Sequence, residues 1–410
     1  MDKELIIRSG TSAVDFALQK DGKLIELNKE EDSNKFNVGD IFIAKIRKAV
    51  PGLNAAFVNV GYEKDGFLHY HDLGPQVSSM LKFIKRVSTG KLKDYSLKNF
   101  TFEKDIDKDG VITDVLKSNQ SLLVQVVKEP ISTKGPRISS ELSIAGRYIV
   151  LVPFSNRISV SQKIESKEEK DRLKRLVKSI KPKGFGIIVR TVAEGKKVAE
   201  LDRDLQNLMG RWTGMCKKMY KPHHPSKVLG ELNRASSLLR DIFNDSFTSI
   251  IVDDETLYTQ IKDYVGEIAP SKESIVKLYQ SNVPIFEKYG IERQIKTSFG
   301  RTVSMSKGAY LVIEHTEAMH VIDVNSGNRS NKSRNQEDTA LEVNMISATE
   351  IARQLRLRDM GGIIVVDFID MGKAENRKTL FDHLRNEMSD DRAKHKILPP
   401  SKFGLIQITR

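Results

Sequence analysis

Short apolar runs, separated by glycines and polar turns, fill the first third of the chain and predict β-strands. Residues 14–18 and 24–27 flank Asp21 and Gly22, and an Asp-Gly pair is a strong signal for a β-hairpin. Beyond the hairpin, glycine-punctuated runs predict further strands at residues 38–46, 55–60, 67–70 and 122–127. Short strands with glycine between them favour a small β-barrel.

A polar stretch interrupts these strands between about residues 74 and 119. It is rich in lysine and contains an acidic run at residues 103–109. Because surface loops tolerate added length at a small entropic cost, we interpret this stretch as a long surface loop inserted in the barrel.

The middle of the chain mixes helical and strand patterns. Apolar side chains recur with helical spacing in residues 167–181 and 202–220, and apolar runs at residues 148–152 and 186–191 predict strands. Cys216, the single cysteine, falls in the second helical stripe, so we expect a buried thiol rather than a nucleophile. One cysteine excludes an internal disulfide framework, and a reducing cytosolic compartment fits best.

The C-terminal part has the clearest pattern. Residues 309–314 and 319–325 predict paired strands, and a long helix follows that ends at Gly361 and Gly362. An apolar run at residues 363–370 then turns acidic. A helix that connects two strands can bring them side by side in one sheet.

Composition adds an argument from charge. The 410 residues suggest roughly two to three domains. They include 67 Lys or Arg and 54 Asp or Glu, a net charge of +13. This surplus favours a polyanionic partner, although charge alone is equally compatible with a merely basic protein. The apolar runs are too short for a signal peptide or a membrane span, so nucleic acid is the preferred partner.

Two of the predicted C-terminal strands end in carboxylates, Asp323 and Asp367. Together they could hold Mg²⁺, and a metal so held can activate water and stabilise charge on a phosphoryl oxygen. Asn325 shares a strand face with Asp323, and Asp370 competes with Asp367 as the ligand. By residue type alone, strand-end caps are the commoner role. Basic residues suited to a phosphodiester backbone follow at Arg329, Lys332 and Arg334.

Two further groups are candidates for binding nucleic acid. Phe57 and Phe67 lie on neighbouring predicted strands, where exposed aromatic rings would stack on nucleobases, although a place in the core is the more common fate of Phe. Residues 134–137 could form an anion pocket with Arg190 and Thr191. Unless the fold brings these last two segments together, they are unrelated surface features.

Taken together, these segments resemble the ribonuclease E/G family of bacterial endoribonucleases. The motifs that carry the resemblance follow the family order along nearly the whole chain, at residues 55–58, 66–68, 142–148, 188–191, 322–326, 351–359, 361–371 and 403–405. The stretch from Ala352 to Met371 is the most specific of them.

The resemblance implies a multidomain α/β fold. The first domain would be RNase H-like and split in sequence, and it would be interrupted by an S1-type OB barrel and a 5′-sensor region. A DNase I-like catalytic domain would follow. The implied ranges are 1–36 with 226–298 (RNase H-like), 37–128 (S1, with the loop at about 74–119), 129–225 (5′ sensor) and 299–410 (catalytic).

The resemblance also implies the roles of particular residues. Asp323 and Asp367 would bind the catalytic Mg²⁺, and Asn325 would assist. The S1 aromatics match Phe57 and Phe67. The family's pocket for a 5′-monophosphate matches Gly135, Arg190, Thr191 and Lys394, the last at a position that is often Arg.

The implied function is Mg²⁺-dependent hydrolysis of single-stranded RNA, with preference for 5′-monophosphorylated substrates, in cytoplasmic RNA processing and decay. The alternative is an RNA-binding scaffold with weak or lost catalysis. The resemblance implies that the family continues past the position of Arg410 into a paired-Cys zinc link between protomers. No such pair occurs in this sequence, which either stops before that segment or lacks the link. We therefore expect a homo-oligomer, either a dimer or a weaker association, without that zinc site.

Overall fold

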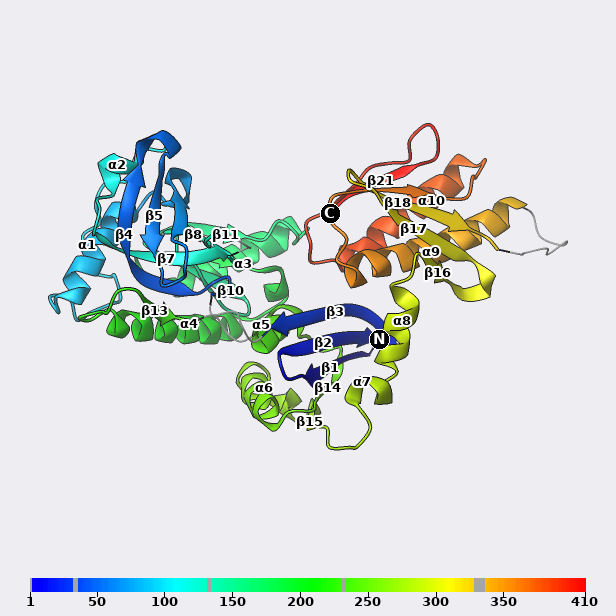
Figure 1. Ribbon diagram of the computed structural model, residues 1–410, viewed down its shortest axis with the longest axis horizontal. Coiled ribbons are helices and arrows are strands. Elements are labelled where there is room, and N and C mark those ends of the chain that lie inside the picture. The colour runs from blue at the N-terminus through cyan, green and yellow to red at the C-terminus, as the bar shows by residue number, and fades with distance from the viewer. Residues whose placement is uncertain (1, 32–35, 131–133, 231–233, 328–335) are drawn as a thin grey trace. The chain divides into compact units, whose positions relative to one another are not determined.

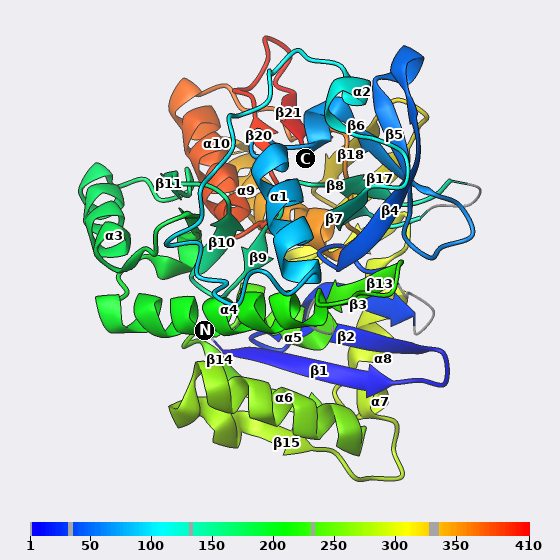
Figure 2. The same ribbon diagram turned by 90° about the vertical axis from the view of Figure 1, so that its left-hand side faces the viewer.

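The computed structural model describes residues 2–31, 36–130, 134–230, 234–327 and 336–410 (Figures 1 and 2). Two compact units divide the chain. One runs from Ser33 to Phe243, and the other joins Met1–Asp32 to Asn244–Arg410. No helix in the described ranges is both long and apolar enough to cross a membrane.

A five-stranded sheet, in the order β15-β14-β1-β2-β3, opens the unit that contains both chain ends. Its strands are β1 (Lys3–Ser9), β2 (Ala13–Lys20), β3 (Lys23–Glu31), β14 (Phe247–Val252) and β15 (Val276–Leu278). The predicted hairpin is confirmed as β2 and β3, which pair antiparallel around the Asp21–Gly22 turn. Helix α6 packs beside β14 and β15 (Figure 2), and the helices here are α6 (Glu255–Ile268), α7 (Ile285–Lys288) and α8 (Ile291–Ser298).

The other unit contains the predicted barrel. Five strands close on themselves because β4 pairs with both β5 and β7, which is consistent with an OB-type fold. The strands are β4 (Ile41–Val50), β5 (Ala55–Asn59), β6 (Gly66–His69), β7 (Ser121–Lys128) and β8 (Arg137–Ser139). A sixth strand, β13 (Ser226–Leu229), adds to β4.

A four-stranded sheet, in the order β11-β12-β10-β9, completes this unit. Its strands are β9 (Ile144–Ala145), β10 (Ile149–Pro153), β11 (Ile158–Val160) and β12 (Phe185–Val189). The accompanying helices are α3 (Lys167–Ile180), α4 (Val198–Lys218) and α5 (Arg234–Ile242). The predicted helices at 167–181 and 202–220 correspond to α3 and α4.

The expectation of a polar surface loop at residues 74–119 is wrong. The segment forms α1 (Val77–Ser88) and α2 (Ile112–Val115), and it contributes to the unit's main hydrophobic core. Phe83 is fully buried, with its ring centroid 5.5 Å from that of Trp212 on α4, whose indole N–H donates to the Tyr95 carbonyl at 2.7 Å. The dense lysines concealed an apolar helical stripe formed by Val77, Met80, Phe83, Ile84 and Val87.

A six-stranded mixed sheet, in the order β16-β17-β18-β19-β21-β20, forms the C-terminal part of the unit that contains both chain ends. Its strands are β16 (Thr302–Ser304), β17 (Tyr310–His315), β18 (His320–Asn325), β19 (Ile363–Asp367), β20 (Lys396–Ile397) and β21 (Ile406–Thr409). The helices α9 (Gln336–Leu357) and α10 (Ala374–Ser389) pack against each other. The predicted strands at 309–314 and 319–325 are confirmed as β17 and β18.

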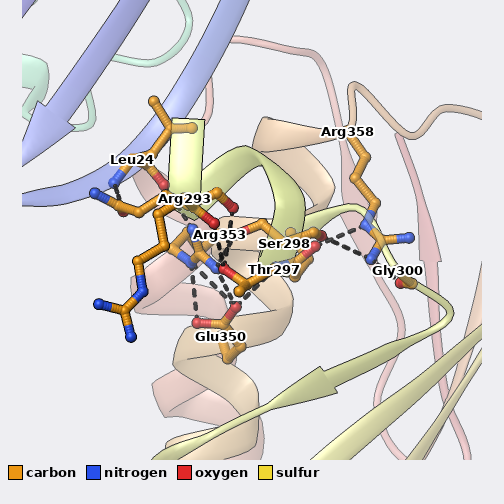
Figure 3. A network of polar contacts seen from close by, with 10 residues as sticks. Leu24, Arg293, Thr297, Ser298, Gly300, Glu350, Arg353 and Arg358 are labelled. Carbon is orange, nitrogen blue, oxygen red and sulfur yellow. Dashed lines mark hydrogen bonds and ion pairs between the residues drawn. The ribbon is translucent and has the colours of Figure 1, made fainter. Parts of the chain in front are cut away.

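Helix α9 is tied to the first sheet and to α8 by a polar network (Figure 3). The Arg353 guanidinium pairs with Glu350 at 2.6 Å and donates to the carbonyl of Leu24, on the β2–β3 hairpin, at 2.6 Å. It also reaches the Ser298 hydroxyl at 3.3 Å, and Arg358 donates to the Ser298 carbonyl at 2.8 Å. Charge-assisted donors that end on backbone carbonyls fix this helix to the rest of its unit.

The aromatic core beneath α1 leads to a prediction about stability. We expect Phe83→Ala to lower the free energy of unfolding of this unit by about 3–5 kcal/mol, because it leaves a cavity beside Trp212. Chemical denaturation followed by Trp fluorescence measures this, since the chain has one tryptophan. Lys85→Ala, on the exposed face of the same helix, is the control and should change little. Equal effects of the two substitutions would contradict the packing described here.

Candidate functional site

Two carboxylates stand side by side where two parallel strands end. Strands β18 and β19 pair parallel, with Asp323 in register with Asp367, and both residues are exposed. This placement follows from the chain path, because α9 connects the strands as a crossover and brings their carboxyl ends to one edge of the sheet. The structure thus brings together two of the predicted site residues that are 44 positions apart in sequence.

The neighbours of these carboxylates orient and perturb them. Asn325 lies at the end of β18 and donates from its side-chain amide to Asp323 at 2.8 Å, which fixes the rotation of that carboxylate. The pKa of Asp367 is raised by partial desolvation, and then by the negative charges of Asp323 and Asp370. Three acidic groups therefore act on one another at this edge.

Two residues of α9 hold the loop that follows β19, and the sequence analysis missed both. The fully buried Asn344 donates to the Ile369 carbonyl at 2.8 Å and accepts from the Ile369 N–H at 3.0 Å. Glu337 accepts from the N–H groups of Gly372 and Lys373 at 2.8 and 3.0 Å. A polar Asn inside an apolar stripe was a usable signal for Asn344; Glu337 had none.

The acidic edge has the chemistry of a magnesium site. Mg²⁺ binds through one or two carboxylates and keeps several waters, and Asp323 and Asp367 offer two neighbouring carboxylates exposed to solvent. The described parts of the chain contain no group of three or more His, Cys, Asp or Glu side chains that could hold a metal ion. Such an open pair suits a hydrated cation better than a structural metal. The predicted RNA contact Arg329 lies outside the described residues.

The predicted aromatic pair faces outward on the barrel. Phe57 and Phe67 are cross-strand neighbours on β5 and β6, with ring centroids 5.9 Å apart and both rings partly exposed. The Lys48 ammonium lies 5.3 Å from the Phe57 ring centroid. His69, two residues after Phe67 on the same strand face, extends this surface with its ring 6.5 Å away. The strand alternation could have predicted His69.

The predicted anion-binding residues already have partners. The Arg190 guanidinium pairs with Asp241 of α5 at 2.6 Å and donates to the Gly146 carbonyl at 2.8 Å. The Thr191 hydroxyl lies 2.8 Å from that of Ser161. The Arg190 guanidinium is therefore not free to bind phosphate, because any anion that it binds must compete with Asp241.

The two other predicted members of that pocket have surroundings of their own. Gly135 packs so closely on the barrel turn that a Cβ would meet the Asp65 carbonyl oxygen at 2.2 Å, so only glycine fits there. Lys394 is exposed, in the segment after α10 of the other unit. Cys216 is buried in the α4 stripe, as predicted, and burial raises the pKa of its thiol.

The fold and this edge define a class of α/β proteins with an OB-type barrel and a two-carboxylate site. A family model described as the Ribonuclease E/G family matches residues 143–410. Ribonuclease G of Escherichia coli (strain K12) is 33% identical over 410 residues, which cover 100% of this chain and 80% of that protein. Ribonuclease E of Nostoc sp. is 34% identical over 377 residues, covering 91% of this chain and 51% of that protein. The chain belongs to the ribonuclease E/G family, which confirms the resemblance seen in its sequence.

The anchoring of the loop after β19 by Asn344 can be tested by measuring protein stability and hydrogen exchange. We expect Asn344→Leu to destabilise the protein by about 1–3 kcal/mol for each Ile369 backbone group left unpaired. Hydrogen exchange at the Ile369 amide should also become faster. Asn386→Leu, at an exposed position of α10, should leave both measurements unchanged. Unaltered exchange at Ile369 in the Asn344 variant would show that the side chain does not hold the loop.

Proposed function

We propose that this chain is a Mg²⁺-dependent endoribonuclease that hydrolyses single-stranded RNA. The observation that carries the proposal is the pairing of Asp323 with Asp367 at the ends of neighbouring parallel strands. Its relatives are named Ribonuclease G and Ribonuclease E, which supports an endoribonuclease of RNA processing.

The residues of the acidic edge have separate tasks. Asp323 and Asp367 would hold the cation, and Asn325 keeps the Asp323 carboxylate in one orientation by donating to it. When bound, Mg²⁺ would activate water for attack on phosphorus and offset negative charge on the phosphoryl oxygens. Asn344 and Glu337 fix the loop after β19, so the acidic groups keep their spacing when RNA binds.

The barrel supplies a surface for RNA that does not depend on base identity. Phe57 and Phe67 present partly exposed rings on which bases stack, and each stacked base contributes about 1–3 kcal/mol. Lys48 lies beside the Phe57 ring and is placed to neutralise a phosphate. Stacking and charge together favour single strands, because only unpaired bases expose their faces.

Arg190 and Asp241 suggest how a 5′-monophosphate would be selected. A terminal phosphate carries more negative charge than a carboxylate and offers more acceptor oxygens, so it can displace Asp241 from Arg190. A 5′-hydroxyl lacks this charge and leaves the ion pair intact. Asp241 therefore competes for Arg190, and only a 5′ end with more negative charge than its carboxylate would displace it.

The proposed metal site predicts the effect of removing its charge. Asp323→Asn or Asp367→Asn should lower the cleavage rate by at least about 1,000-fold, because each removes metal-binding charge. RNA affinity should remain nearly unchanged, and Asn325→Ala should slow cleavage less. A gel assay of a single-stranded, 5′-monophosphorylated RNA with and without Mg²⁺ measures the rate.

Asp382→Asn, at an exposed position of α10, is the matched control and should cleave normally. Near-normal cleavage by the Asp367→Asn variant would show that Asp367 is not the metal ligand, and Asp370 would be the next candidate. Wild-type protein that binds RNA but does not cleave it with Mg²⁺ would instead be a binding scaffold.

The 5′-end proposal predicts opposite effects at the two partners of one ion pair. Arg190→Ala should remove most of the preference for a 5′-monophosphate, about 10- to 100-fold in kcat/KM, and leave cleavage of 5′-hydroxyl RNA unchanged. Asp241→Asn should raise kcat/KM for the monophosphorylated RNA, because the competing charge is gone. Rates on the two 5′ ends measure this. Equal loss on both substrates with Arg190→Ala would make Arg190 structural.

A further inference from the structure

A groove of about 830 Å³ opens beside the loop that follows β19, and Asp370 is the one acidic group of the site described above that lines it. Its walls come from that loop, from the first turns of α10 and from the turn between β20 and β21, which is coloured red in Figure 1. The volume lies within the range of about 300–1,000 Å³ that is typical of small-molecule sites.

Phe403 stands at the mouth of this groove with 85% of its surface exposed. The turn that carries it is fixed by backbone hydrogen bonds, from Gly404 N–H to the Ser401 carbonyl at 3.0 Å and from Ser401 N–H to the Leu405 carbonyl at 2.9 Å. Gly404 has a φ of +79°, a conformation that favours glycine. The aromatic ring is thus presented to solvent on a hydrogen-bonded turn, where a base could stack on it.

The charges around the groove favour an anion. Arg377, Lys378 and Lys402 line it, against a single acidic lining residue, Asp370. Arg377 donates to the carbonyl of Met371 at 2.6 Å, so its positive charge meets a neutral group there. Lys378 and Lys402 are both exposed.

The groove reaches the acidic edge through one residue, Asp370. Asp370 follows Asp367 by three residues and lines the groove, and a Cβ at Gly404 would lie 3.6 Å from the Asp370 carboxylate. A ligand that fills the groove would therefore lie beside the carboxylates that are proposed to act on a phosphodiester. An aromatic face with flanking lysines matches a nucleotide, which offers a base to stack and a phosphate to neutralise.

We propose that this groove binds one nucleotide of the RNA strand next to the phosphate that is cut. The base stacks on Phe403, and its phosphate lies between Lys378 and Lys402. The inference rests on the proposed function and adds a second base-binding position, in the unit that carries the acidic edge.

The test measures RNA binding in EDTA, so it does not depend on cleavage. Fluorescence anisotropy gives Kd for a single-stranded RNA with a known cleavage site and for versions with one abasic nucleotide at successive positions. Phe403→Ala should raise Kd for the intact RNA about 5- to 100-fold, whereas Phe403→Trp should retain affinity. At one position near the cut, the abasic change should raise the Kd of the wild-type protein as much as Phe403→Ala does. The same abasic change should not raise the Kd of the Phe403→Ala variant further.

Phe299→Ala is the matched control, because Phe299 is an exposed aromatic of the same unit and does not line the groove. Lys378→Gln and Lys402→Gln should each lower the slope of log Kd against log salt by about 0.7, and Lys288→Gln, at an exposed lysine of the same unit, should not.

Unchanged Kd with Phe403→Ala would overturn the proposal, as would equal weakening for every abasic RNA or for Phe299→Ala. A wild-type protein that binds RNA but shows no Mg²⁺-dependent cleavage would refute the proposed function. The Kd comparison at Phe403 would still test the groove, because binding is measured without cleavage.

Discussion

The parallel pairing of β18 with β19 is the constraint on which the rest of the site depends. Parallel neighbours cannot be joined by a tight turn, so the chain must leave the sheet and return through a crossover. Here the crossover contains α9, and it places Asp323 and Asp367 at the same register. The negative charges of two neighbouring carboxylates repel each other, so the arrangement persists because packing elsewhere holds both strands.

Most of that packing involves α9. Its apolar residues fill the core of the C-terminal sheet, and Leu357 at its end joins the core of the first sheet. Its polar residues act at both ends: Glu337 and Asn344 hold the loop beyond β19, whereas Arg353 binds the Leu24 carbonyl. The same helix therefore holds the loop beside the acidic edge and is itself anchored to the first sheet of its unit.

One proposed RNA contact differs from the others, because its charge is already balanced within the chain although the chain as a whole is basic. Arg190 is paired with Asp241, whereas Lys378 and Lys402 are exposed to solvent. A surplus of 13 positive charges would attract any polyanion from a distance, but it would discriminate poorly between polyanions. In the proposed selection of the 5′ end, a ligand would have to replace Asp241 at Arg190, and only a ligand with enough charge would gain from that exchange.

The sequence by itself determined the hairpin at Asp21–Gly22, the buried Cys216 stripe and the family, because these depend on local turn chemistry, helical spacing or the order of motifs. It also singled out Asp323 and Asp367 as residue types suited to Mg²⁺. Local patterns failed at residues 74–119, where lysines on the solvent face hid a helix that packs on Trp212.

Only the tertiary structure decided which groups meet across long separations. The Asp241 partner of Arg190 and the pairing of Asn344 with Ile369 join residues 51 and 25 positions apart. The groove at Phe403 likewise combines a loop, a helix and a hairpin turn. No local propensity encodes such contacts, because their energy comes from desolvation and charge in a surrounding that exists only after the chain has folded.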